Sequence, residues 1–169
     1  PPVFPDRDFD ITTHGAVGDG STLNTEAIAR AIAACHEAGG GRVIVPKGRF
    51  LTGAVHLKSN VNLHLQDGAT LLFSTDPRHY PIVFTRWEGI ELMNYSPLVY
   101  AYRQKNIAIT GAGTLDGQGG DRHWWHWKGP WRGTVSTGWR EGMPDQRPAR
   151  ARLFRMAEDG VPVEQRVFG

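Results

Sequence analysis

The residues best suited to binding chemistry are tryptophans gathered late in the chain. Five of the six Trp residues lie between positions 124 and 139, namely Trp124, Trp125, Trp127, Trp131 and Trp139. An indole ring has a large flat apolar face on which the C–H face of a sugar can stack. The same rings could instead pin a long loop to the body of the protein. Both roles can hold for different members, and we predict that Trp124, Trp125 and Trp127 contact a substrate.

A cation and an indole also lie side by side earlier in the sequence, at Arg86 and Trp87. A guanidinium group binds carboxylates through two parallel hydrogen bonds, so Arg86 could hold an acidic sugar while Trp87 stacks against it. The alternative is a structural ion pair of Arg86 at the base of its loop. We predict both residues as substrate-binding and leave the ion pair open.

Catalytic groups are harder to assign. Asp116 and Asp121 form a close acidic pair, and glycoside cleavage needs two carboxylates at a set separation. However, Asp116 lies in Gly-Thr-Leu-Asp-Gly, which is typical of a turn, so the structural role is favoured. We therefore assign no catalytic residue within this chain.

A metal or cofactor site is not indicated either. His123 and His126 have helical spacing, but no third His or carboxylate completes a ligand set. Cys35 is the only cysteine, which excludes an internal disulfide and a Cys-based metal site. We expect no metal and no cofactor.

Composition indicates a globular protein with many turns. Hydrophobic residues make up 40% and charged residues 21%, and the 21 Gly and 11 Pro argue for little helix. The formal charge is +2, divided between −2 for residues 1–121 (10 Lys and Arg, 12 Asp and Glu) and +4 for 122–169 (9 and 5). That balance is too small to indicate nucleic acid, and we expect no membrane partner.

One helix is predicted at 25–38, which precedes Arg86, Trp87 and the tryptophans in the sequence. Ile28, Ala31, Ile32 and Cys35 recur at helical spacing and form one apolar stripe. Asn24 is placed to cap the helix through its side-chain oxygen. Three glycines follow the helix, and glycine readily adopts the left-handed turn that ends one.

Very short apolar strands come next, with links too short for crossover helices. We place them at 42–45, 49–52, 54–57, 61–65 and 70–73. Consecutive strands of this kind are typical of a β-solenoid, so we expect an all-β parallel β-helix with a capping helix. Residues 1–169 would then form one partial domain with two long loops, 76–97 and 117–150.

Two segments of similar sequence, which we call the internal echo, indicate a structural repeat. Lys58–Leu63 aligns with Gln104–Ile109, which places Asn60 and Asn106 in equivalent positions 46 residues apart. We interpret this offset as two turns of about 23 residues each, which is within the range of solenoid repeats.

Three longer segments carry a family resemblance. They are HGAVGDGSTLNTEAIARAIAACHEAGGGRVIVPKGRFLTG, HLKSNVNLHLQDGATL and NIAITGAGTLDGQG. Together they closely resemble the N-terminal part of glycoside hydrolase family 28, the polygalacturonases and related pectinases. TRWEGIELMNYSPLVYAY and the Trp-rich loop ending in VPVEQRVFG are similar to the bacterial exo-acting branch. The helix with its three glycines is shared with the wider pectin lyase-like superfamily, so it specifies fold better than reaction.

The resemblance implies a right-handed parallel β-helix in an exported enzyme, secreted or periplasmic, that hydrolyses α-1,4-galacturonan (pectin) with inversion. In such a mechanism one Asp protonates the leaving oxygen while other Asp residues activate water across the ring, without a metal. The family marks its active site with Asn-Thr-Asp, adjacent Asp residues, Gly-His-Gly and Arg-Ile-Lys, none of which occurs here. We expect the catalytic residues downstream of residue 169 and no activity from this chain alone.

The partner that the resemblance implies is a polysaccharide, pectin or an oligogalacturonate. Two alternatives stay open: a Ca²⁺-dependent polysaccharide lyase on the same fold, and a non-catalytic β-helix such as a phage tailspike or an adhesin. The sequence does not distinguish endo from exo action, and it does not indicate the oligomeric state.

Overall fold

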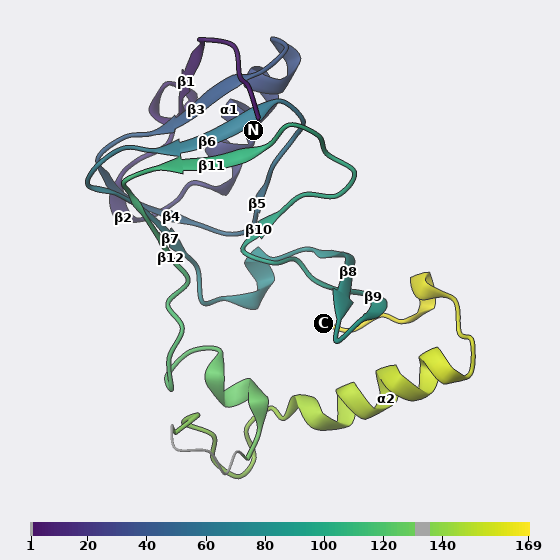
Figure 1. Cartoon of the computed structure of the whole chain (residues 1–169). Helices are drawn as coiled ribbons and strands as arrows, with labels where there is room; N and C mark the ends of the chain where they lie inside the picture. The colour runs from purple at the N-terminus through teal and green to yellow at the C-terminus, as the bar shows by residue number, and fades with distance from the viewer. Residues whose placement is uncertain (1, 131–135) are drawn as a thin grey trace. The chain divides into compact units, whose positions relative to one another are not determined.

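The structure is a computed structural model that describes residues 2–130 and 136–169 (Figure 1). Its residues divide into two compact units. The first comprises Pro1–Ser74 and Pro97–Gly117, and the second comprises Thr75–Ser96 and Gln118–Gly169. The segments predicted as long loops, 76–97 and 117–150, thus fall almost entirely in the second unit.

The first unit is built from three parallel sheets. The first holds β1 (Asp8–Asp10), β3 (Gly41–Val45), β6 (Val61–Leu65) and β11 (Ala108–Gly111). The second holds β2 (Asp19–Leu23), β4 (Gly48–Thr52), β7 (Ala69–Phe73) and β12 (Thr114–Asp116). The third pairs β5 (Val55–His56) with β10 (Val99–Tyr100). The chain is therefore mostly β with parallel pairing, as the short apolar segments predicted.

Strands that follow one another along the chain belong to these sheets in a fixed order. The run β3, β4, β5 is followed by β6 and β7, which pair with β3 and β4. After the second unit's first segment, β10, β11 and β12 pair in turn with β5, β6 and β7. Each of these later strands therefore pairs in parallel with a strand from earlier in the chain.

The 46-residue echo corresponds to one such step, so the interpretation as two turns is wrong. Strand β11 pairs directly with β6, with Ala108 opposite Asn62. The corresponding step from β3 to β6 places Val43 opposite Leu63, only 20 positions on. The extra length arises because residues 75–96, which lie between β6 and β11 in the sequence, belong to the second unit.

The two asparagines of the echo nevertheless have a common structural role. Asn60 and Asn106 both adopt left-handed backbone conformations, with φ of 66° and 52°. Asn tolerates this region better than most residues because its short side chain bonds locally. The Asn106 amide donates to the Asn60 side-chain oxygen at 3.2 Å, so the equivalent turns are stacked.

Apolar side chains stacked in register form the core of the first unit. Val45 lies opposite Leu65 and Phe50 opposite Leu71, and all four are at most 2% exposed. Burying a side chain of this size contributes about 1.5–3 kcal/mol relative to leaving it exposed.

Helix α1 (Thr25–Glu37) matches the predicted 25–38 helix and buries the predicted stripe against this core. Its end is a Schellman motif. The Gly39 N–H donates to His36 O at 3.0 Å, and the Gly40 N–H donates to Cys35 O at 2.8 Å. Gly39 has φ of 89°, which explains the glycine there.

Asn24 precedes α1, but its predicted side-chain cap is absent. The Asn24 side chain instead accepts from Val17 N at 2.7 Å and donates to the carbonyls of Val17, Thr22 and Leu51. It is 1% exposed. Asn24 therefore ties the preceding loop to strand β4 rather than capping the helix.

The second unit contains an antiparallel hairpin and a helix. Strands β8 (Ile82–Trp87) and β9 (Ile90–Tyr95) are joined by Glu88 and Gly89, both with positive φ, as a type I′ turn requires. Helix α2 (Gln146–Glu158) begins after Asp145, whose carboxylate accepts from Arg147 N.

Helix α2 was not predicted, and its first residues lie in the predicted loop 117–150. Leu153 on α2 packs with Leu92 of β9 and with Phe168. This is a narrow apolar contact on an arginine-rich helix, so the sequence shows little periodicity.

The described residues also form four short 3₁₀ helices: η1 (Ile11–His14), η2 (Pro77–His79), η3 (Trp125–Lys128) and η4 (Val163–Gln165). Within the part of the chain that the structure describes, no helix combines the length and apolar character needed to cross a membrane.

Candidate functional site

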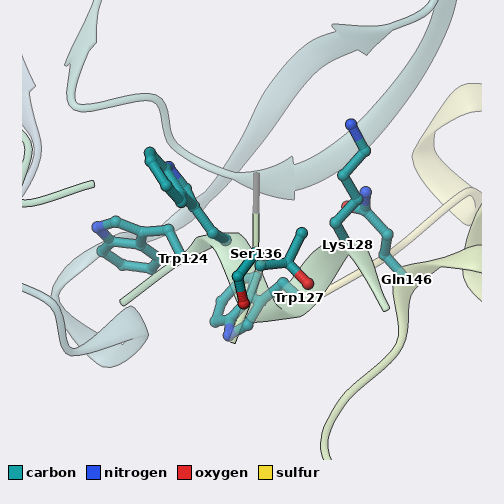
Figure 2. A pocket seen from close by; sticks show the side chains of 7 residues that line it. Trp124, Trp127, Lys128, Ser136 and Gln146 are labelled. Carbon is teal, nitrogen blue, oxygen red and sulfur yellow. The ribbon is translucent and has the colours of Figure 1, made fainter. Parts of the chain in front are cut away.

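A tryptophan-lined cavity of about 510 Å³ lies in the second unit (Figure 2). It is lined by Trp124, Trp125, Trp127, Lys128, Ser136, Thr137 and Gln146. The three tryptophans predicted to contact substrate are thus brought together, beside one cation and several hydrogen-bonding groups. Trp131 lies outside the described residues.

Short local structure holds these rings in place. Trp124 immediately precedes η3 and has φ of 60° and ψ of −48°, an unusual conformation for a bulky residue. Such conformations cost about 1–3 kcal/mol and persist only where the surroundings enforce them. The Trp124 and Trp127 rings meet edge to face at 5.3 Å, which provides part of that enforcement.

Aromatic neighbours tie two of the rings to the rest of the second unit. Tyr80 contacts Trp124 at 5.8 Å between ring centroids, and Tyr95 contacts Trp127 at 5.9 Å. Burial raises the pKa of Tyr80 to about 12, so its phenol stays neutral. Trp125 is 46% exposed and presents the most open ring of the three. The aromatic contacts of Trp124 and Trp127 fit the loop-pinning role, although both rings also line the cavity.

A second cavity of about 490 Å³ adjoins the first, because Trp127 and Gln146 line both. Its other walls come from hairpin residues including Trp87 and Tyr95, from α2, and from Val167 to Gly169. Trp87 is 36% exposed. The structure thus places the predicted Trp87 beside the predicted Trp127.

Arg86 lies differently. Its guanidinium pairs with Glu91 Oε1 at 2.9 Å, directly across the hairpin, and Arg86 lines neither cavity. The structural ion pair left open by the sequence is therefore present. Substrate contact by Arg86 stays a prediction.

Two arginines that the sequence did not single out line the second cavity. Arg150 pairs with Glu88 at 2.6 Å and stacks on Phe154 at 4.6 Å. Arg152 stacks on Phe168 at 4.4 Å. Among the described residues, no carboxylate forms an ion pair with Arg152. The excess of basic residues after position 122 was the available signal, but only α2 directs these side chains to the cavity.

The predicted acidic pair is divided between the units. Asp116 is the last residue of strand β12, opposite Leu72, and so does not lie in the predicted turn. Asp121 belongs to the second unit. Among residues 2–130 and 136–169, no three His, Cys, Asp or Glu side chains are close enough to share a metal ion.

The parallel sheets and the aromatic cavity define a class: a mostly β protein with a candidate site suited to carbohydrate. No family model matches the chain. An exopolygalacturonase from Thermotoga maritima has a similar solved structure, with 52% identity, a TM-score of 0.92, and coverage of 99% of this chain and 37% of that one. A family 28 exopolygalacturonase from Yersinia enterocolitica is 36% identical, with a TM-score of 0.61, over 67% of this chain and 21% of that one.

A curated relative agrees. The exo-poly-alpha-D-galacturonosidase of Dickeya chrysanthemi is 42% identical over 122 residues, which cover 68% of this chain and 20% of that protein. The chain is therefore a relative of the family 28 polygalacturonases and matches an N-terminal portion of them. It spans between about a fifth and two fifths of the length of these relatives.

Proposed function

We propose that this chain is part of a polygalacturonase that hydrolyses α-1,4-galacturonan in pectin. The observation that carries this proposal is the 52% identity to the Thermotoga maritima exopolygalacturonase, which extends over 99% of the chain. The aligned region includes the second unit, where the candidate cavities lie. The reaction would be the inverting hydrolysis of family 28, with its catalytic carboxylates outside these 169 residues.

The architecture in this proposal is a right-handed parallel β-helix. The regular return of β6 to β3, and of β11 to β6, supports a stack of coils. Right-handed crossover is the strong preference for parallel strands in general. Helix α1 would cap the stack, since its apolar stripe packs against the core while Glu26, Arg30 and Glu37 are exposed.

The second unit would contribute substrate contacts. Trp87, Trp125 and Trp127 offer ring faces for stacking on sugars. A galacturonate residue also carries a carboxylate, and Lys128 in the first cavity and Arg152 in the second offer cations to bind it. Trp124 contacts both Tyr80 and Trp127, and Arg86, which precedes Trp87 in β8, remains a candidate for substrate contact.

A chimera tests the proposal. This chain would replace the matching N-terminal portion of the Thermotoga maritima enzyme, and release of galacturonic acid from polygalacturonate would be measured. We expect hydrolysis by the chimera and none by this chain alone. A folded chimera without hydrolysis would count against the proposal.

Assays of the complete protein that contains this chain, rather than of the chimera, separate the lyase alternative. A lyase would require Ca²⁺ and would form an unsaturated product that absorbs in the ultraviolet, whereas a hydrolase releases saturated sugars. A β-helix without any catalytic role would yield no product in either assay. Because pectin lies outside the cell, we further propose a secreted or periplasmic location for the complete protein.

A further inference from the structure

The two-stranded sheet of the first unit presents a second group of aromatic and basic side chains. In β5 and β10, Val55 pairs with Val99, and His56 pairs with Tyr100. Val55 is 2% exposed, whereas His56 is exposed. The His56 and Tyr100 rings contact each other at 5.1 Å with a tilt of 52°. Neighbouring strands thus present adjacent rings on the outer side of this sheet.

The pattern continues beyond β10. Tyr102 is 42% exposed, and the Arg103 guanidinium lies 5.1 Å from its ring centroid. Arg103 has φ of 55°, in the left-handed region that an arginine rarely adopts. Strained backbone of this kind is concentrated at ligand-binding positions. The arrangement therefore points to a function for Arg103 beyond a solvated surface charge.

A side-chain clamp holds this conformation. Ser59 donates from its backbone N and from its Oγ to Gln104 Oε1, at 2.7 and 2.8 Å. The Lys105 N–H donates back to Ser59 Oγ at 3.0 Å. The segment that carries Tyr102 and Arg103 is thus fixed against the segment that follows β5, so the surface is organised before any ligand binds.

The charged side chains in these two segments are all basic. Neither 54–66 nor 98–115 contains an Asp or Glu. Lys58, Arg103 and Lys105 are all exposed, and none takes part in an ion pair among the described residues. Three exposed cations that form no ion pair within the described part of the chain favour an anionic ligand.

We propose that these side chains form a second contact surface for an acidic polysaccharide chain. We name it the β5–β10 surface, and it consists of His56, Lys58, Tyr100, Tyr102, Arg103 and Lys105. The aromatic rings would stack on pyranose faces while the cations pair with uronate carboxylates. This surface lies in the first unit and shares no residue with the two cavities of the second unit.

Nucleic acid is the other polyanion to consider. The first unit carries 8 Lys and Arg and 8 Asp and Glu, so its formal net charge is zero. Nucleic-acid binding depends mainly on neutralising closely spaced phosphates, which favours a strongly basic surface. A chain of sugars with one charge per residue matches alternating rings and cations better.

The test uses the full 169-residue chain and a galacturonate oligomer, a probe whose choice rests on the proposed function. Calorimetry would measure affinity, and hydrogen exchange would report protection of 54–60 and 98–106 on binding. We expect Lys58→Gln/Arg103→Gln to weaken binding about fivefold, because exposed ion pairs each contribute modestly. Tyr102→Ala should weaken binding as well, and Tyr102→Phe should retain it.

The matched control removes two exposed cations at the start of β4 in the same unit, by Lys47→Gln/Arg49→Gln. We expect its affinity to stay near that of the wild type. Equal losses in both double variants, no protection of 54–60 and 98–106, or tighter binding to single-stranded DNA than to the oligomer would each overturn the inference. A chimera that fails to hydrolyse polygalacturonate would instead contradict the proposed function.

Discussion

Asn24 provides the sharpest test of how the first unit is held together. Its side chain forms hydrogen bonds with Val17 N and with three carbonyls, those of Val17, Thr22 and Leu51. Substitution by Ala removes all of them. Leu51 O keeps a donor, because the Asn24 backbone N–H also reaches it at 2.8 Å.

The expected loss follows from these contacts. Each hydrogen bond contributes about 1 kcal/mol net, and more where a buried partner is left unsatisfied. Val17 and Thr22 are exposed residues, so water can partly replace the lost partner. We therefore expect Asn24→Ala to cost about 2–3 kcal/mol, a decrease in Tm of about 4–12 °C for a chain of this size.

Asn24→Ser separates this role from helix capping. Ser caps helices about as well as Asn, so it would restore stability if capping were the main contribution. Its hydroxyl is too short to reach the carbonyls that Asn24 joins, and we expect Ser to be nearly as unstable as Ala. Urea unfolding followed by circular dichroism measures all three proteins. Wild-type stability of Asn24→Ser would refute the reasoning.

Three further predictions concern single side chains. Trp125→Ala should weaken binding of a galacturonate oligomer about fivefold, because one stacking face is lost, whereas Trp139→Ala, outside both cavities, should not; calorimetry measures both. Cys35 is fully buried, and burial raises the pKa of its thiol to about 11, so we expect it to react with thiol reagents at pH 8 only after denaturation. Reaction in the native protein would contradict this. Arg78 holds the pKa of Asp76 at about 2, below its ordinary 3.8, through side-chain and backbone hydrogen bonds. The resulting stabilisation should be present above about pH 4 and lost as the pH falls toward 2, and NMR titration should show Arg78→Ala raising this pKa.

Some site residues could be found from sequence, and others could not. The Trp cluster was visible because five rings crowd one segment, and the structure brings Trp124, Trp125 and Trp127 to one cavity. Arg152 was not visible, because it matters only once α2 directs it beside Phe168. Arg86 looked like a ligand for carboxylates, and in the structure it pairs with Glu91.

The amino-acid sequence by itself determined helix α1, the short parallel-pairing strands and the similarity to polygalacturonases. The helix and the strands depend on local periodicity, on glycine at a helix end and on apolar alternation, which each segment carries independently of its neighbours. The similarity to polygalacturonases depends instead on the resemblance of three longer sequence segments. Only the tertiary structure decided that Asn24 joins a loop to β4 and that α2 lines a cavity. It also decided that the segments 46 residues apart form the directly paired strands β6 and β11. Such pairings join residues distant along the chain, and local patterns do not encode which distant groups will meet.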